Sequence, residues 1–171
     1  MEGKQPSIKV ELDIVDKVLE LIGFAALVAL IGLPFYYYGQ LPENIPRHYG
    51  INGEPDAFSG KAILWTLPAI GVPMFTGLFF LSRKPQWFNY PEEITPENAA
   101  QMYKSGAKLV RLLNNVIAVA FAYMTFSTIK TVLGTQSGLG VWFTPVFLSA
   151  IFLPIGFYLF YSVRKSKVIN K

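Results

Sequence analysis

The sequence has no cysteine and a single histidine, and charged residues make up only 15% of its 171 residues. Without cysteine the chain cannot form disulfide bonds, and zinc–thiolate and thiol chemistry are excluded. A soluble domain of this length usually carries nearer a quarter charged residues. The shortage of charge is concentrated in four long blocks, and this composition is typical of a membrane protein.

These four apolar blocks are long enough to cross a bilayer as helices. The uncharged runs cover residues 21–38, 62–81, 112–129 and 141–163. At about 1.5 Å per residue they would span roughly 27–35 Å, which matches a hydrocarbon core of about 30 Å. We therefore predict an all-α membrane protein that forms one membrane domain over residues 1–171. Its predicted transmembrane helices are 18–38, 62–81, 109–130 and 141–163.

Lysine and arginine are distributed unevenly between the segments that flank these blocks. Twelve of the 15 lie in the N-terminal segment, in or just after the loop between the second and third blocks, or at the C-terminus. Only Arg47, Lys61 and Lys130 lie in the other two loops. Because cytoplasmic flanks are enriched in Lys and Arg, we predict that both termini and loop 82–108 are cytoplasmic and that loop 40–61 is extracytoplasmic. Membrane insertion thus accounts for the net charge of +4, and no nucleic-acid partner is expected.

The segment before the first block has a helical apolar pattern. Apolar side chains recur every three or four residues, at Ile8, Leu12, Val15, Leu19 and Ile22. Acidic residues and lysines occupy the positions between them, which favours an amphipathic helix. We predict an N-terminal interfacial helix over residues 8–17 that leads into the first span. It would either lie on the lipid headgroups or dock a partner protein.

A helix start precedes the third span, at Thr95-Pro96-Glu97. This order supplies an N-cap, a proline at the first helical position and an acid in the first turn, so a helix should begin there and run into the span. Asn114 and Asn115 lie early in that span. An amide in hydrocarbon is costly unless it bonds a neighbouring helix, where such contacts contribute about 0.6–2 kcal/mol. Two roles stay open for this pair, helix packing and contact with a substrate or ion.

Prolines lie inside three of the predicted spans, at Pro34, Pro68, Pro73 and Pro154. Helices broken at such residues occur in transporters. Transporter sites, however, usually come with inverted repeats and with charges inside the membrane, and the sequence suggests neither. A transporter is therefore disfavoured.

Loop 40–61 contains Asn52-Gly53, a strong signal for a β-hairpin with a type I′ turn. A hairpin built on this turn places Tyr49 opposite Asp56 and Arg47 opposite Phe58. Side chains alternate between the two faces of a strand. Arg47 and Asp56 would then share one face and form an ion pair, whereas His48 would point to the other.

This arrangement argues against one role for the histidine, that of a metal ligand. Because His48 would not converge with Glu54 and Asp56, we predict no metal site and no cofactor. His48 is then either a structural residue, hydrogen-bonded within a compact cap over the helix ends, or a pH-sensitive group on the extracytoplasmic side.

The stretch LPENIPRHYGINGEPDAFSGK, residues 41–61, resembles the N-terminal domain of unknown function in SdpI-type bacterial membrane proteins. The matching positions are Pro42, Ile45, Pro46, His48, Gly53, Glu54, Pro55, Asp56 and Lys61. The resemblance covers roughly residues 20–81, and residues 82–171 match much less. It implies a bacterial cytoplasmic (inner) membrane protein that protects the cell from a secreted antimicrobial peptide or takes part in signalling. The candidate recognition or structural residues of the loop are Pro46, Arg47, His48, Asn52, Gly53, Glu54, Pro55, Asp56 and Lys61.

The sequence offers no enzymatic site. It has no phosphate-binding glycine motif, no nucleophile beside a base and no paired catalytic acids. We therefore expect a non-enzymatic protein for toxin immunity or envelope sensing and signalling. Its partners would be the lipid bilayer and either other membrane proteins or an antimicrobial peptide. The alternative is a small accessory or structural subunit of a larger membrane protein complex.

Overall fold

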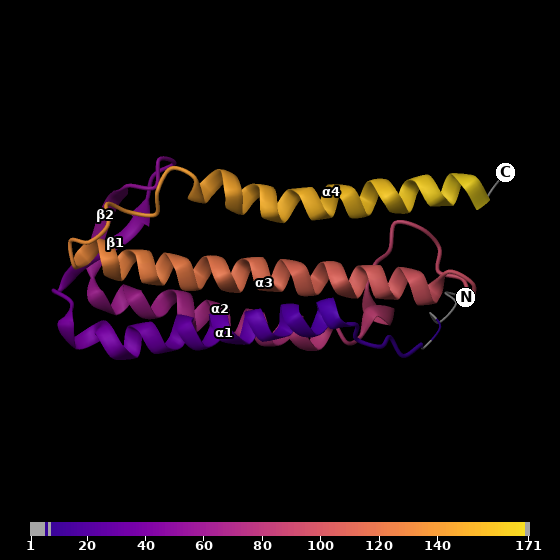
Figure 1. The fold of residues 1–171 in the computed structure, drawn as a ribbon, viewed down its shortest axis with the longest axis horizontal. Helices are drawn as coiled ribbons and strands as arrows, with labels where there is room; N and C mark the ends of the chain where they lie inside the picture. Colours follow the sequence, from indigo (N-terminus) through magenta and orange to yellow (C-terminus); the bar gives the residue numbers. More distant parts are fainter. Residues whose placement is uncertain (1–5, 7, 170–171) are drawn as a thin grey trace.

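Four long helices and one β-hairpin make up the computed structural model, which describes residue 6 and residues 8–169. The helices are α1 (Ile14–Tyr37), α2 (Thr66–Leu81), α3 (Ala99–Val132) and α4 (Phe143–Ile169). The hairpin pairs β1 (Asn44–Tyr49) with β2 (Pro55–Gly60), and 3₁₀ helices cover Tyr38–Gln40, Lys61–Trp65 and Pro85–Trp87. Figure 1 shows the hairpin at one end of the helices, here called the hairpin end. The start of α1 and the end of α4 lie at the opposite end.

The four helices are long and apolar enough to cross a membrane, over Ile14–Gln40, Lys61–Leu81, Ala99–Val132 and Phe143–Phe160. Large apolar side chains face outward along them, among them Phe35, Ile70, Phe80, Phe152 and Phe157. Exposure of such faces to water is unfavourable, whereas contact with lipid chains is not. The chain is therefore a mostly helical, multi-pass membrane protein, as its apolar blocks predict.

Helices α1, α2 and α3 pack closely around a small apolar core. Its buried members are Ala26, Leu30, Phe75, Ala118 and Ala122. A Cβ atom on Gly23 would lie 2.7 Å from the ring of Phe75 and 2.9 Å from Oδ1 of Asn115. Glycine at this position therefore lets α1 approach both other helices.

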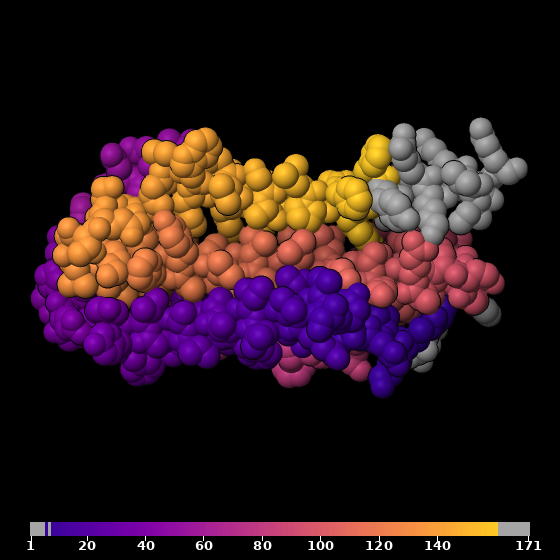
Figure 2. Space-filling view, in the orientation of Figure 1, coloured from indigo at the N-terminus to yellow at the C-terminus, as the bar shows by residue number. Residues whose placement is uncertain are grey.

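Helix α4 is attached differently from the other three. It lies along α3 on the side away from α1 and α2 (Figure 1), and Figure 2 shows open gaps between α4 and α3. None of the residues Phe143–Phe160 is buried. Since little apolar packing holds this helix, its position depends strongly on the loop that leads into it.

The first helix begins later than the periodicity predicts. Residues 8–13 are not helical, so the predicted interfacial helix over residues 8–17 is wrong. A capping box explains the start at Ile14. The Asp13 carboxylate accepts a 3.0 Å hydrogen bond from the Asp16 N–H, and the Asp16 carboxylate accepts one of 3.0 Å from the Asp13 N–H. These bonds satisfy backbone N–H groups that have no partner within the helix. They fix the start of α1 at a position that the apolar pattern does not predict.

The third helix runs without interruption from the loop through the span, as predicted. Its 34 residues would extend about 51 Å, well beyond a hydrocarbon core of about 30 Å. It starts at Ala99, a turn later than the predicted start at Thr95. The side chain of Asn98 accepts a 2.9 Å hydrogen bond from the Thr95 N–H, which closes a turn ahead of the helix.

Proline does not break the spans. Pro34, Pro73 and Pro154 lie inside α1, α2 and α4, and each of these helices continues past its proline. The described helices therefore lack the discontinuity on which the transporter alternative depends.

Candidate functional site

The predicted hairpin is present, but its turn differs from the predicted type. The Gly53 N–H donates to the Gly50 carbonyl at 2.9 Å, and the Gly50 N–H donates to the Glu54 carbonyl at 2.9 Å. Gly53 has a φ of 78°, whereas Asn52 does not have a positive φ. A type I′ turn needs positive φ at both central positions, so that prediction is wrong. The loop has three residues, Ile51 to Gly53, with a type I turn and a left-handed glycine.

The longer loop shifts the strand register by one position. Tyr49 pairs with Pro55 instead of Asp56, and Phe58 pairs with Pro46 instead of Arg47. Irregularities between Pro46 and His48 and between His48 and Tyr49 change the alternation of faces further. A one-residue shift or a bulge reverses the side to which a side chain points. The predicted separation of His48 from Asp56 is therefore wrong.

His48 and Asp56 in fact meet on the hairpin surface. The His48 Nδ1 atom lies 2.6 Å from the Asp56 Oδ1 atom, and the side chains are 68% and 50% exposed. This contact replaces the predicted ion pair between Arg47 and Asp56. An exposed pair of this kind contributes about 0–1 kcal/mol to stability. Its main effect is to hold an imidazole and a carboxylate in a defined arrangement at the hairpin end.

The other candidate residues of the loop divide between its tip and its base. At the tip, the Asn52 side chain donates a 2.7 Å hydrogen bond to Glu54. At the base, Lys61 lies 3.0 Å from the Glu43 carboxylate and 5.1 Å from the centre of the Tyr38 ring. Within the described part of the chain, no three His, Asp or Glu side chains lie close enough to hold a metal ion.

A cavity of about 290 Å³ lies beneath the hairpin, where β1 faces the starts of α2 and α4 and the end of α3. The Tyr49 hydroxyl reaches across it to the Thr128 hydroxyl at 2.8 Å. Burial raises the pKa of the Tyr49 phenol, and its hydrogen bond with Thr128 opposes that effect. Thr125, only 1% exposed, also lines the cavity, and its hydroxyl has no hydrogen-bond partner in the structure. The cavity thus offers hydroxyl groups, together with Arg47 and His48, within a mostly apolar wall.

The tip of the hairpin is joined to the α3–α4 loop. The Leu139 N–H donates a 2.7 Å hydrogen bond to the Gly53 carbonyl. A Cβ atom on Gly53 would lie 2.5 Å from the Gly140 carbonyl oxygen. The loop is tied to α3 in turn, since Ser127 donates to the Gly138 carbonyl at 2.6 Å and Tyr123 donates to the Leu139 carbonyl at 2.9 Å. Sequence reasoning missed this contact, although the glycines in Ser137-Gly-Leu-Gly are a signal for a special backbone.

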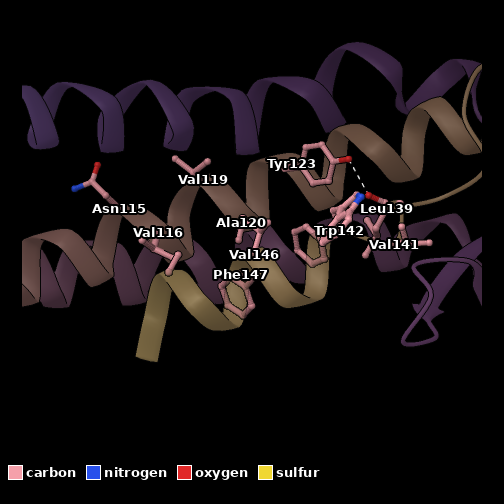
Figure 3. Close-up of a pocket in the computed structure, with 13 residues that line it drawn as sticks. Asn115, Val116, Val119, Ala120, Tyr123, Leu139, Val141, Trp142, Val146 and Phe147 are labelled. Atoms are coloured by element: carbon pink, nitrogen blue, oxygen red, sulfur yellow. Dashed lines mark hydrogen bonds between the residues drawn. The ribbon is translucent and has the colours of Figure 1, made fainter. Parts of the chain in front are cut away.

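An apolar groove of about 650 Å³ separates α3 from α4 (Figure 3). Tyr123 and Trp142 lie at one end of it and Asn115 at the other. Leu139 and Phe143 line both this groove and the cavity beneath the hairpin, so the two spaces adjoin. The walls carry almost only apolar side chains, which suits an acyl chain or the apolar face of a peptide.

The two predicted asparagines have different surroundings. Asn114 donates a 3.1 Å hydrogen bond to the Phe75 carbonyl and so joins α3 to α2. Asn115 donates a 2.8 Å hydrogen bond to the Arg111 carbonyl within its own helix. Both side-chain oxygens are buried without a hydrogen-bond partner. Asn114 thus has the contact that helix packing requires, while Asn115 borders the apolar groove.

A cluster of charged residues at the opposite end was not foreseen. Asp16 and Arg111 are almost fully buried and form a 2.8 Å ion pair between α1 and α3. Arg83 holds Glu20 with two hydrogen bonds, of 2.9 and 3.0 Å. A buried ion pair between these helices was not predicted from the sequence. The spacing of residues 13, 16 and 20 and of residues 104, 108 and 111 places each set on one helix face, which is the signal that was available.

Asp13 extends this cluster outside the span. Its carboxylate lies 2.6 Å from the Lys108 amine and 3.5 Å from that of Lys104. The hydrogen bond from Lys108, together with the Asp16 backbone and the nearby positive charges, holds the pKa of Asp13 well below its usual range. Sequence reasoning placed the acids of this segment on the polar face of an interfacial helix, whereas in the structure Asp13 and Asp16 join the start of α1 to α3.

Comparison with known proteins finds a family of unknown function and an uncharacterized relative. Residues 25–72, from within α1 through the hairpin into α2, match a family described as Domain of unknown function (DUF1648). The chain is also 29% identical over 166 residues to an uncharacterized protein of Archaeoglobus fulgidus, with 89% of this chain and 90% of that protein covered. No solved structure matches significantly. The family match thus falls on the segment that contains the hairpin.

Proposed function

We propose that this protein is a non-enzymatic sensor or immunity protein of a prokaryotic cytoplasmic membrane, with both termini in the cytoplasm and the hairpin outside. The resemblance of residues 41–61 to SdpI-type proteins supports this role. The archaeal relative favours including archaea as well as bacteria. The observation that carries the proposal is the hydrogen bond from Leu139 to Gly53, because it connects an exposed surface to the loop that positions α4.

The ligand on this proposal is an amphipathic, membrane-active peptide. Glu54 and Asp56 present exposed carboxylates at the tip and on the side of the hairpin, where a cationic peptide would be attracted. The apolar groove begins directly behind the hairpin, at Leu139 and Phe143. A peptide bound at the membrane surface could therefore place its charged face on the hairpin and its apolar face in the groove.

Binding would act on α4 through the loop. A ligand shifts a conformational equilibrium only when it binds one state better than the other. A peptide that enters the groove contacts α4 directly, and one that alters the tip at Gly53 alters the Leu139 contact. Since α4 has no buried side chain over Phe143–Phe160, a small change in the loop would move it at low cost. Such a movement would carry a signal to the other face of the membrane or shield the peptide from the bilayer.

A resistance assay tests this proposal. Cells that express the protein are grown with a panel of secreted membrane-active peptides and compared with cells that express Gly53→Val and Gly60→Val at equal membrane levels. Gly53→Val should abolish protection because its side chain would collide with Gly140. Gly60→Val is the matched control, because Gly60 has an ordinary φ of −56° and open space around it. Equal protection by both variants would argue against the hairpin as the working surface.

The accessory-subunit alternative rests on the exposed face of α4. That face carries exposed large apolar side chains, among them Val146, Phe152 and Leu153, and a second membrane protein could cover them. Purification in a mild detergent distinguishes the two functions. Stoichiometric co-purification of another membrane protein would favour the subunit role, and a chain that purifies alone would favour sensing or immunity.

A further inference from the structure

A second cavity, separate from the hairpin, lies at the opposite end of the helices. It has a volume of about 410 Å³, which is within the range of small-ligand sites. Its walls come from three segments: the extended residues 8–12, residues 82–86 after α2, and Arg111 of α3. The cationic residues among them are Lys9, Arg83, Lys84 and Arg111, and no acidic residue lines the cavity.

The position of Arg111 in this cavity is well defined. One terminal nitrogen donates to Asp16 at 2.8 Å, and the other contacts the Ser82 carbonyl at 3.4 Å. The Nε atom is buried and has no hydrogen-bond partner, its nearest carboxylate oxygen being that of Glu20 at 3.5 Å. Arg111 therefore lines the cavity with a guanidinium that keeps one donor without a hydrogen bond, although Glu20 lies at ion-pair distance.

The charge around the cavity is unbalanced. Asp16 and Glu20 neutralise Arg111 and Arg83. Among the described residues, neither Lys9 nor Lys84 has a carboxylate within ion-pair distance. Four cationic side chains against two carboxylates leave two positive charges at the mouth of the cavity. A ligand with one or two negative charges would neutralise this excess positive charge.

We propose that this cavity binds the phosphate of an anionic phospholipid headgroup. A phosphate supplies both the negative charge and the hydrogen-bond acceptors that the cavity requires. The cavity adjoins the last residue of the α2 span, Leu81, and so lies at the level of lipid headgroups. Ile8, Val10 and Leu12 add apolar surface to its wall, and Trp87 nearby is 70% exposed, as tryptophan at a membrane interface commonly is. Basic pockets between membrane helices bind anionic headgroups for these reasons.

Lipid titration of the purified full chain in detergent tests this site. Binding of phosphatidylglycerol and of phosphatidylcholine is measured by native mass spectrometry for the wild type and for Lys9→Gln/Lys84→Gln. The wild type should prefer phosphatidylglycerol, and the double variant should lose roughly 25-fold in affinity for it, because each lysine near an anionic lipid contributes about a fivefold factor. Lys9→Arg/Lys84→Arg should restore binding. Both lysines are exposed, so helical content should not change.

A control variant separates a built site from general attraction. Lys17→Gln/Lys104→Gln removes the same charge from exposed positions on α1 and α3 outside the cavity and should leave affinity within about twofold. Equal losses in the two double variants, or no preference for phosphatidylglycerol, would overturn the proposal. Inorganic phosphate and glycerol phosphate are tested as competitors. Displacement of the lipid by either at equal concentration would assign the cavity to a soluble phosphate and overturn the lipid assignment.

Discussion

The main-chain N–H of Leu139 donates a 2.7 Å hydrogen bond to the main-chain carbonyl of Gly53, across 86 positions of sequence (139 minus 53). This bond joins the tip of the hairpin to the loop between α3 and α4. Both partners are buried, although the hairpin itself is largely exposed. The hairpin, the loop and α4 are therefore coupled mechanically, and the first prediction concerns that coupling.

Replacement of Gly53 by valine should loosen the loop and α4 while leaving the other helices in place. A β-branched residue at a φ of 78° costs about 1–3 kcal/mol, and its Cβ atom would also meet Gly140. Hydrogen exchange of the membrane-inserted protein should show faster exchange over residues 133–146 than in the wild type. Gly60→Val should leave those residues unchanged. Slow hydrogen exchange of residues 133–146 in both variants would mean that the hairpin does not hold the loop in place.

The pair of His48 and Asp56 should contribute little to stability. Both side chains are at least half exposed, and water screens their interaction. His48→Ala and Asp56→Asn should each change the free energy of unfolding by less than about 1 kcal/mol. Metal analysis of the purified protein should show no dependence on His48. One equivalent of a transition metal that His48→Ala removes would contradict this interpretation.

Loss of one partner of the buried pair of Asp16 and Arg111 should be far more damaging. Arg111→Ala leaves the Asp16 carboxylate buried beside Glu20 without its cation, and breaking such a pair costs about 3–5 kcal/mol. Thermal unfolding in detergent should show the loss. The double variant Asp16→Leu/Arg111→Met removes both charges and should be more stable than Arg111→Ala. The opposite order would show that the pair is not what joins α1 to α3.

Acidification should weaken the contact between Asp13 and Lys108. The pKa of Asp13 is lowered in the folded protein, so the unfolded chain takes up a proton at higher pH than the folded one. The stabilisation is therefore complete above the ordinary carboxyl pKa of about 3.9 and is lost as pH falls below it. Asp13→Asn keeps a good N-cap but removes the charge, and it should reduce the acid sensitivity of thermal unfolding. Glu11→Gln, at an exposed position, serves as the control. Equal acid sensitivity of the wild type and Asp13→Asn would contradict the prediction.

The predicted orientation is open to direct labelling because the chain has no native cysteine. Ser137→Cys and Ala100→Cys place single thiols at exposed positions near the two ends of α3. With both termini in the cytoplasm, an impermeant thiol reagent should label residue 137 in intact cells and residue 100 only after lysis. Labelling of residue 100 alone in intact cells would reverse the orientation and move the hairpin into the cytoplasm.

The sequence by itself determined the four spans, the continuous third helix and the presence of a hairpin around Asn52-Gly53. These features depend on local composition: long uncharged blocks need lipid, and glycine accepts a positive φ that other residues avoid. Local patterns also explain the errors. The apolar periodicity that begins at Ile8 does not reveal the capping box at Asp13, which sets the start of α1. The Asn-Gly sequence is compatible with more than one turn type.

Only the tertiary structure decided the strand register, the meeting of His48 with Asp56, and the partners of Gly53, Asp16 and Arg111. A three-residue loop and strand irregularities change the face of the hairpin to which side chains point, relative to the predicted register. Such shifts depend on what the strand packs against. Asp16 and Arg111 are 95 positions apart, so neither residue's neighbours in sequence identify its partner. Their pairing follows from the packing of α1 against α3, where a buried charge is stable only beside its counter-ion.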